Sequence, residues 1–142
     1  MPEKEEPKVS YPWLRDDSTK IVLSADTPDD CATLRMDELR DVLENAGSKL
    51  VDIDVSGCPQ LRVENLIAKN CPRLRSLSLQ GCEVTDNTIG GIARGCPKLR
   101  SLNLGGCKIT GRCIGEISAE CKELSSLDLR RCKALTELML LR

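Results

Sequence analysis

A twelve-residue stretch that returns at a constant interval constrains the fold of this chain more than any other feature. Residues 71–82 read CPRLRSLSLQGC, and related copies begin at Cys96 and Cys121, so that both steps are 25 residues. A fixed period of this length is typical of repeats in which each unit buries its apolar face only by stacking on its neighbours. The sequence therefore predicts a solenoid whose core runs through every copy.

Two further copies are less regular. Residues 50–58 carry Ile and Val in place of two leucines and begin 24 residues before Leu74. Residues 135–140 repeat the leucine spacing only 11 residues after Leu124, which leaves no room for a helix between the two. A solenoid normally ends in a polar cap. We instead expect a final strand with an apolar edge at Met139, Leu140 and Leu141.

Apolar spacing and turn residues place the remaining elements. Residues 20–24 are short and β-branched and predict a first strand. Thr85 and Thr110 stand where an N-cap hydroxyl would accept a hydrogen bond from a backbone N–H of the first helical turn. Helices are predicted at 32–46, 86–94 and 111–119. In the last two helices, the residues predicted to point inward are Ile89, Ile92 and Ala93, and Ile114, Ile117 and Ser118.

These elements divide the chain into three parts. Residues 1–10 are charged, contain two prolines, and are expected to be a disordered tail. Residues 11–47 form a capping segment with the first strand–helix unit, and residues 48–142 form the repeats. The length of 142 residues fits one domain.

The composition restricts both the core and the chemistry. Apolar residues make up 40% of the chain, but there is no Phe and only one Trp and one Tyr, so the core has to be aliphatic. There is no His, which excludes a histidine base, a histidine metal ligand and a Ser/His triad. Both aromatic residues lie within residues 11–14, which we expect to fold over the first end of the solenoid. An exposed docking peptide is the alternative.

Charge is unevenly distributed, although the formal net charge is −1. Residues 1–70 carry 15 acidic and 9 basic side chains, whereas residues 71–142 carry 7 acidic and 12 basic ones. In a linear array this becomes an acidic-to-basic gradient that would orient a charged partner. A solvated surface without such a role is the alternative.

The repeat sets most of the nine cysteines into two columns. Cys31 and Cys113 fall outside both columns. We expect a buried ladder of small apolar side chains that stack at the turns. The column at the strand ends contains Cys58, Cys82, Cys107 and Cys132, and the column after the helices contains Cys71, Cys96 and Cys121.

The cysteines have three alternative roles. A metal site would need clustered thiolates, typically CxxC pairs, and the sequence has none. Disulfides between adjacent rungs are allowed by distance, but stacked side chains aim their sulfurs in the same direction. A catalytic thiol would need an activating neighbour, and Cys113 beside Arg112 is the candidate. Free thiols, a charged start without a signal peptide and no long apolar run predict the cytoplasm or nucleus, with no membrane span.

The pattern CPxLxxLxLxxCxxVT resembles the cysteine-containing subclass of leucine-rich repeats, over roughly residues 48–142. The resemblance implies a right-handed α/β horseshoe, a leucine-rich-repeat solenoid with a parallel concave sheet and convex helices. This subclass is best known from F-box ubiquitin-ligase adaptors, where the repeats select the protein to be ubiquitinated, and from related proteins without an F-box. Residues 1–45 show no F-box.

Strand alternation predicts which side chains face a partner. In LxxLxL the leucines point into the core and the residues between them face outward on the concave side. Arg75 and Arg100 flank this face. The concave rows contain Asp52, Ser76, Ser101, Ser126 and Glu137; Asp54, Ser78, Asn103, Asp128 and Met139; and Ser56, Gln80, Gly105 and Arg130.

The predicted function is a protein–protein interaction module, and the resemblance implies a link to a ubiquitin-ligase complex or its substrate. The alternative is an assembly subunit that dimerises or stacks through its C-terminal edge. We expect no enzyme, no cofactor and no metal. Nucleic acid is not an expected partner, because the concave face lacks interleaved basic and aromatic residues and the pI is about 5.6.

Overall fold

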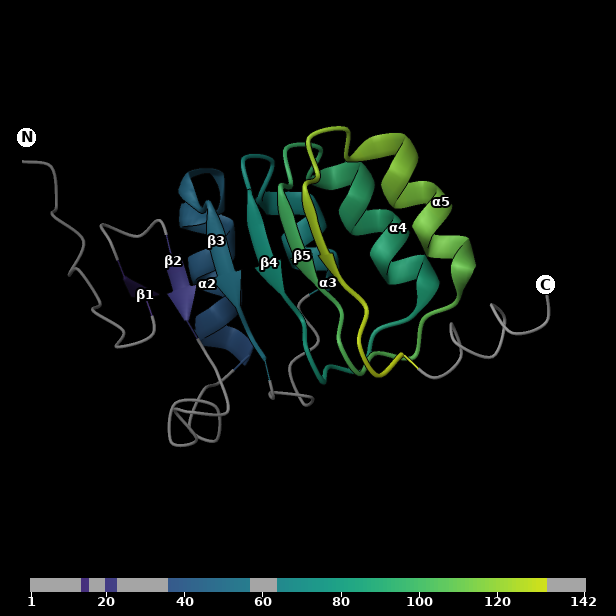
Figure 1. The fold of residues 1–142 in the computed structure, drawn as a ribbon. Coiled ribbons are helices and arrows are strands. Elements are labelled where there is room, and N and C mark those ends of the chain that lie inside the picture. Colours follow the sequence, from purple (N-terminus) through teal and green to yellow (C-terminus); the bar gives the residue numbers. More distant parts are fainter. Residues whose placement is uncertain (1–13, 16–19, 23–35, 57–63, 133–142) are drawn as a thin grey trace, which may run out of the picture.

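The computed structural model describes residues 14–15, 20–22, 36–56 and 64–132, which form one stack of strand–helix units (Figure 1). Within these residues, six short strands make one sheet in chain order. The strands are β1 (Leu14–Arg15), β2 (Lys20–Val22), β3 (Asp52–Asp54), β4 (Ser76–Ser78), β5 (Ser101–Asn103) and β6 (Ser126–Asp128). The helices are α2 (Met36–Ala46), the 3-10 helix η1 (Gly47–Lys49), α3 (Glu64–Asn70), α4 (Asp86–Gly95) and α5 (Gly111–Glu120).

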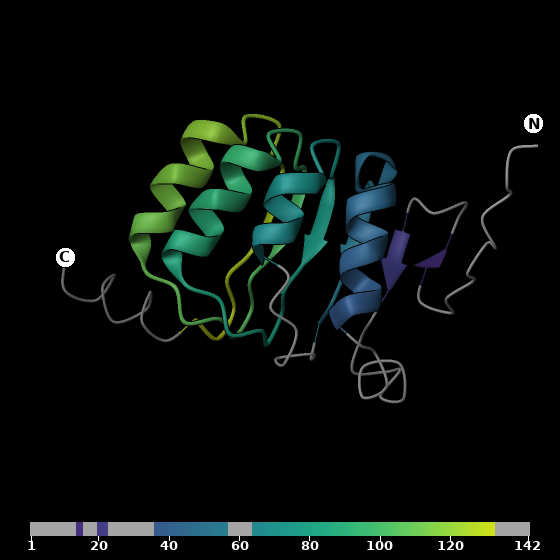
Figure 2. The same ribbon diagram turned by 180° about the vertical axis from the view of Figure 1, so that it is seen from behind.

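The strands from β2 to β6 are parallel, and each pairs with the next one along the chain. Parallel neighbours need a crossover connection, which the helices provide. All the described helices lie on one face of the sheet, as the front and back views show (Figures 1 and 2). The fold is therefore the predicted α/β solenoid, and none of the described helices lies on the other face of the sheet.

The core is a spine of aliphatic side chains between the sheet and the helices. The strand centres Ile53, Leu77 and Leu102 stand in register and are at most 2% exposed. The residues that flank each centre face away from the core, because side chains alternate along a strand. The spine continues through Leu50, Leu74, Leu99, Val55, Leu79 and Leu104 on the sheet side and Ile67, Ile89, Ile92 and Ile117 on the helix side.

The helix predictions are confirmed in position, with small differences at the ends. The helices α4 and α5 each end one residue later than predicted. Residues 32–35, predicted as the start of the first helix, lie outside the described residues. The sequence places Cys71 after a helix but does not give the bounds of that helix, α3, which has only seven residues and one fully buried side chain, Ile67, too little to show a helical period. No helix of the described residues is long and apolar enough to cross a membrane.

The two predicted N-caps behave differently. Thr110 Oγ1 accepts a hydrogen bond from Arg112 N at 3.4 Å, as predicted. The prediction for Thr85 is wrong, because its hydroxyl makes no capping hydrogen bond and lies 3.2 Å from Thr88 Oγ1 instead. In α5 the position that corresponds to Thr88 is occupied by Cys113, which offers no competing hydroxyl. The choice between a cap and a side-chain partner thus depends on the next helical turn.

The predicted inward position of Ser118 is also wrong. Ser118 is exposed, whereas its counterpart Ala93 is 1% exposed. The helix α4 packs between α3 and α5, but no described helix packs on the far side of α5. The residue at the edge of the inward-facing side of each helix, Ala93 or Ser118, is therefore buried only where the helix of the next repeat covers it.

The strand β2, predicted over residues 20–24, is paired on both sides, with β1 and with β3. Leu14 and Arg15 of β1 pair antiparallel with Ile21 and Lys20 of β2. The segment at residues 11–14 was expected to cover this end of the solenoid, and its last residue does pair there; residues 11–13 lie outside the described residues. An antiparallel strand at this edge satisfies backbone groups that would otherwise be open to pairing with another chain.

At the other end the burial of the spine decreases. Leu124, Leu127 and Leu129 are half-buried, whereas the same positions one repeat earlier are buried. The final strand predicted around residues 135–140 and its apolar edge lie outside the described residues. The strand β6 is thus less enclosed than β5 within the described part of the chain.

A carboxylate joins the last two helical repeats. Asp86, at the start of α4, accepts hydrogen bonds from Thr110 N at 2.8 Å and Thr110 Oγ1 at 2.6 Å. Burial raises the pKa of Asp86, but the hydrogen bonds from Thr110 and the charge of Arg112 outweigh it, so the pKa lies below 3.8. Since both partners of the contact come from neighbouring repeats, it holds the two units in register.

We expect Asp86→Asn to lower the free energy of unfolding by about 1–2 kcal/mol at pH 7, since it removes the charge and one acceptor while keeping the shape. Because the folded-state pKa is below the ordinary 3.8, the carboxylate stabilises the fold above that pH, and the contribution is lost as pH falls through the folded value. Urea unfolding at pH 7 and pH 3 measures both effects. An exposed control, Glu83→Gln, should leave the free energy of unfolding unchanged at both pH values. An equal loss of stability at pH 7 and pH 3 in Asp86→Asn would show that the Asp86 charge does not stabilise the fold.

Candidate functional site

The candidate site is the open face, which we define as the side of the sheet opposite the helices (Figures 1 and 2). In β3, β4 and β5 the two residues that flank each buried centre are half-buried and face this side. The strand registers place the predicted rows side by side. One row is Asp52, Ser76, Ser101 and Ser126, and the next is Asp54, Ser78, Asn103 and Asp128.

The second row is largely engaged in turns that end the strands. Asp54, Asn103 and Asp128 each accept a hydrogen bond from the backbone N–H two residues later, at 3.0, 2.9 and 3.0 Å. This is the Asx-turn geometry, in which a short polar side chain replaces a backbone acceptor. Part of the polarity that the sequence suggested for partner binding therefore has a local structural role.

Neighbouring repeats also bind one another across this face. Ser56 Oγ lies 2.6 Å from Ser78 Oγ and donates to Asp54 Oδ1 at 2.6 Å. One repeat further, Asn103 Nδ2 donates to Gln80 Oε1 at 3.3 Å. These contacts fix the side chains of the second and third rows before any partner is present.

The first row is different. The hydroxyls of Ser76, Ser101 and Ser126 make no hydrogen bond to other groups in the described part of the chain, and they lie one repeat apart along the sheet. A serine hydroxyl can both donate and accept, so it can bind either polar group of a peptide backbone. This row is therefore the part of the open face that is available for hydrogen bonding.

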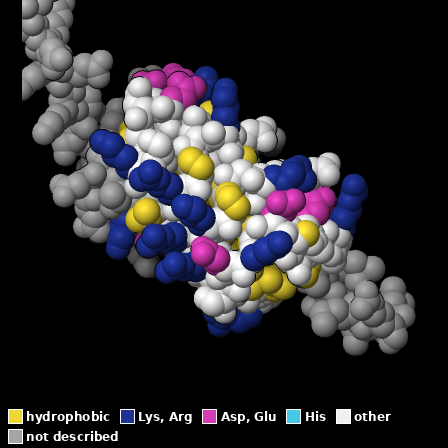
Figure 3. All heavy atoms as spheres, turned by 90° about the horizontal axis from the view of Figure 1, so that it is seen from above, with side chains coloured by type: hydrophobic (Ala, Val, Ile, Leu, Met, Phe, Trp, Pro, Cys, Tyr) yellow, Lys and Arg dark blue, Asp and Glu magenta, His cyan; other side chains and the backbone are white. Residues whose placement is uncertain are grey.

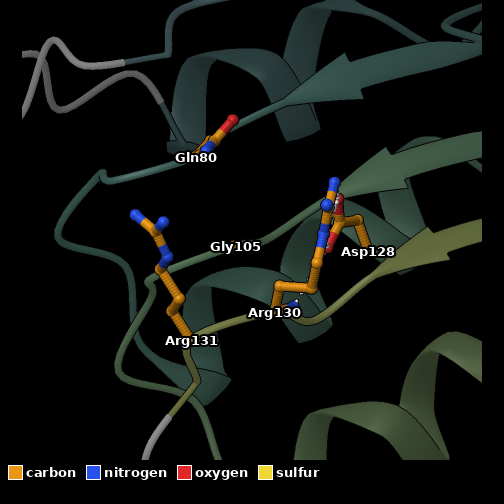
Figure 4. Close-up of a pocket in the computed structure, with 5 residues that line it drawn as sticks. All are labelled: Gln80, Gly105, Asp128, Arg130 and Arg131. Atoms are coloured by element: carbon orange, nitrogen blue, oxygen red, sulfur yellow. Dashed lines mark hydrogen bonds and ion pairs between the residues drawn. The ribbon is translucent and has the colours of Figure 1, made fainter.

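A pocket lies where the open face meets the turns after β4, β5 and β6 (Figure 4). Its volume is about 180 Å³. Gly105 forms its floor, since a Cβ there would lie 3.5 Å from Gln80 Cγ and 3.4 Å from Arg130 O. The lining comes from three successive repeats and consists of Gln80, Gly105, Asp128, Arg130 and Arg131.

One of the two arginines in this pocket is neutralised internally. Arg130 Nη2 lies 2.7 Å from Asp128 Oδ2, and Arg130 Nε donates to both carboxylate oxygens at 3.1 Å. Hydrogen bonds from the Arg130 side chain and backbone lower the pKa of Asp128 to about 2. Both groups are therefore charged throughout the physiological range, and in this geometry their charges largely cancel within the pocket.

The other arginine was missed by the sequence analysis. Figure 4 shows the Arg131 side chain on the opposite side of the pocket from the Asp128–Arg130 pair. It forms no ion pair in the described part of the chain. Arg131 has φ 64°, the left-handed region that its counterparts Gly81 and Gly106 also adopt. The signal was present in the sequence, because a charged residue stands where both earlier repeats have glycine.

Two of the predicted site residues lie beside the first row and outside the strands. Arg75 and Arg100 belong to the loops that lead into β4 and β5, and both are exposed. The structure thus brings the polar rows together on the open face but places these two arginines at the edge where the strands begin.

The seven described cysteines are buried free thiols. Cys58 and Cys31 lie outside the described residues. In the first column, the thiols of Cys82, Cys107 and Cys132 donate to carbonyls of the preceding repeat, at 3.3, 3.2 and 3.1 Å. In the second column, Cys96 and Cys121 make longer contacts of the same kind, at 3.8 Å. The described members therefore form the buried ladder that was predicted.

Burial also disfavours the thiolate form of several of these thiols. It raises the pKa of Cys71, Cys96 and Cys113 from 9.0 to about 12, and that of Cys107 to about 11. The Asp86 carboxylate adds to the effect at Cys113. Within the described residues, no group of three His, Cys, Asp or Glu side chains could hold a metal ion. Cys113 beside Arg112 is thus poorly suited to act as a nucleophile.

We expect the native thiols to resist Ellman's reagent at pH 8. At Cys71, Cys96 and Cys113 the pKa shift from 9.0 to about 12 lowers the thiolate fraction at this pH about a thousandfold, and burial excludes the reagent from all seven thiols. The measurement uses a Cys31→Ser/Cys58→Ser variant, in which the remaining thiols are the seven buried cysteines. Unfolding in guanidinium should release seven reactive thiols. Rapid labelling of any of them in the native protein would contradict the buried ladder.

Comparison with known proteins agrees with this architecture. Residues 70–93 and 95–112 match the family model described as Leucine Rich repeat. The matched residues contain β4, β5 and most of α4, the most regular part of the stack. Comparison with curated proteins gives no match. The matched repeats, the 25-residue period and the parallel sheet in chain order lead to one conclusion: this chain carries leucine-rich repeats and folds as an α/β leucine-rich-repeat solenoid.

Proposed function

We propose that this chain is a protein–protein interaction module that binds a segment of its partner on the open face. The observation that carries the proposal is the row of Ser76, Ser101 and Ser126, whose hydroxyls have no protein partner in the described residues although the rest of the face is internally bonded. Leucine-rich repeats generally serve as such binding surfaces. The free hydroxyls of this row can each donate to or accept from the backbone of a bound segment.

The size of the open face points to a short segment. Four strands at about 4.8 Å spacing and about 16 Å of strand length give only roughly 300 Å², whereas a standard complex buries about 800 Å² on each partner. The described residues also contain no aromatic side chain, the residue type that usually anchors larger interfaces. We therefore propose a peptide-sized contact rather than a docked globular domain.

The pocket gives this contact a direction. With Arg130 neutralised by Asp128, Arg131 is the cation available to a ligand there. We propose that a carboxylate of the partner segment occupies the pocket between Arg131 and Gln80, while the segment runs along the serine row. Charge-assisted hydrogen bonds to a guanidinium are among the stronger polar contacts, so this end would fix the register of the peptide.

The resemblance to cysteine-containing leucine-rich repeats motivates a finer proposal, that the bound partner is a substrate or component of a ubiquitin ligase. We also propose a reducing compartment, the cytoplasm or nucleus, which fits the buried free thiols. Co-purification of ligase components with the wild-type chain, and their loss with an open-face variant, would support the finer proposal.

The open face is tested with two serine substitutions that change charge and size equally. Ser101→Glu places a carboxylate in the middle of the free serine row, and Ser118→Glu places one on the exposed side of α5. Quantitative mass spectrometry of proteins captured from a lysate should show that Ser101→Glu loses at least fivefold of the specific partners, while Ser118→Glu retains them. Equal recovery with both variants, or equal loss, would remove the open face as the binding site.

A second candidate function is self-assembly through the C-terminal end of the stack. The half-buried Leu124, Leu127 and Leu129 favour it, because their counterparts in the preceding repeat are fully enclosed. Multi-angle light scattering over a range of protein concentrations tests self-assembly. A concentration-dependent dimer that Leu127→Glu disrupts would support assembly, and a monomer at all concentrations would exclude it.

A further inference from the structure

The loops that lead into the strands carry a row of cations that the open face does not use. We define the basic ridge as Lys49, Arg73, Arg75, Lys98 and Arg100, all of them exposed. Figure 3 looks down on these loops and shows Lys and Arg side chains gathered across them, with Asp and Glu in smaller groups. The repeat creates this ridge, because Lys49, Arg73 and Lys98 each precede the first leucine of a strand motif.

The backbone holds the ridge in a fixed geometry. Arg75 N donates to Val51 O at 2.9 Å, and Arg100 N donates to Arg75 O at 2.7 Å. Arg75 and Arg100 therefore start from adjacent rungs of the same ladder and carry like charges side by side. In the next repeat, Ser125 occupies the position of Arg100, and Glu123 occupies the position of Lys98. The ridge therefore ends there.

The fold itself gives no reason for this concentration of charge. In the described part of the chain, no carboxylate lies within ion-pair distance of any of the five cations. A cation near a helix C-terminus is favoured by the helix dipole, but that effect is confined to the last turn. Arg75 and Arg100 stand five residues beyond the ends of α3 and α4. Adjacent like charges without counter-charges raise the energy of the free protein, and an anionic partner would relieve this cost.

We propose that the basic ridge is a second binding surface, which takes a short carboxylate-rich peptide laid across the loops. The first and third rungs of the ridge are about 10 Å apart, which an extended peptide covers with three or four residues at about 3.3 Å each. Two or three acidic side chains in such a segment would face two lines of cations. One line is Lys49, Arg73 and Lys98, and the other is Arg75 and Arg100. This surface borders the serine row of the open face, since Arg75 and Arg100 directly precede Ser76 and Ser101, and it lies at the opposite ends of the strands from the pocket.

A nucleic acid is the less suitable occupant. Single-stranded binding relies on aromatic platforms for base stacking, and the described residues have none. Even one small DNA-binding module buries about 600–1,000 Å² of protein surface, more than three rungs of loop supply. The ridge is instead matched in length and charge to a few consecutive acidic residues.

Fluorescence anisotropy with labelled hexaglutamate tests this proposal, with hexaglutamine as the neutral probe and a labelled 12-base-pair DNA duplex as the competing class. Arg75→Gln/Arg100→Gln removes two charges from the ridge, and Arg40→Gln/Lys108→Gln removes two exposed charges elsewhere. We expect the ridge variant to bind hexaglutamate at least fivefold more weakly at low salt. The control variant should stay within twofold of wild type, and Arg75→Lys/Arg100→Lys should retain binding. Arg131→Gln should also retain it, which separates the ridge from the pocket.

Three results would overturn the proposal. The first is no binding of hexaglutamate to the wild-type chain in excess of hexaglutamine. The second is an equal loss in the ridge and control variants, which would show a general charge effect. The third is tighter binding of the DNA duplex that depends on Arg75 and Arg100, which would assign the ridge to nucleic acid. Thermal unfolding of each variant by circular dichroism confirms that the substitutions leave the fold intact.

Discussion

Replacing Leu102 by Ala is expected to lower the free energy of unfolding by about 3 kcal/mol, within the usual range for a fully buried leucine. Leu102 is 2% exposed at the centre of β5, and its register places it between Leu77 and Leu127 in the spine. The truncation leaves a cavity in the middle of the stack, where strands on both sides prevent collapse. Urea unfolding measures the change, and the melting temperature should fall by roughly 10 °C.

The matched control is the same substitution one repeat later. Leu127 holds the equivalent position in β6 but is half-buried, so Leu127→Ala removes less apolar contact. We expect it to cost about half as much as Leu102→Ala, because the transfer and cavity contributions both scale with burial. Equal costs at the two positions would show that the end of the stack is as enclosed as its middle.

The second large effect is expected for Gly95→Ala, at the end of α4. A Cβ built on Gly95 overlaps the carbonyl oxygen of Ala68 and lies 2.8 Å from the Ala68 carbonyl carbon. These are backbone atoms of α3, so no side chain can move aside, and the two helices have to separate. We expect the free energy of unfolding to fall by about 3 kcal/mol, as for severe overpacking. Denaturant unfolding of the purified variant measures it.

Gly91 provides the control in the same helix. A Cβ on Gly91 would meet nothing within 4 Å. Alanine is a better helix former than glycine, so Gly91→Ala should raise the free energy of unfolding by about 0.5–1 kcal/mol. The same substitution four residues apart is thus expected to have opposite signs. A loss of stability at Gly91, or none at Gly95, would contradict the close approach of α3 and α4.

The candidate site was predictable in part, and the reason lies in the range of the interactions. Strand alternation is local, so the serine row could be read from the sequence before the strands were placed. The pocket could not, because Gln80 and Arg131 lie 51 residues apart and meet only through two turns of the solenoid. The neutralisation of Arg130 by Asp128 depends on a turn geometry that residue types alone do not specify.

The sequence by itself determined the period and the inward-facing leucines, because each repeat contributes one strand and side chains alternate along it, and its resemblance to leucine-rich repeats implied the parallel sheet. The tertiary structure decided where local signals were weak or shared between repeats. It placed α3, whose stripe is too short to read, gave Thr85 a side-chain partner instead of a cap, and exposed Ser118 at the edge of the helix layer. In each of these cases the outcome depends on what a neighbouring turn or repeat covers, which a single repeat does not contain.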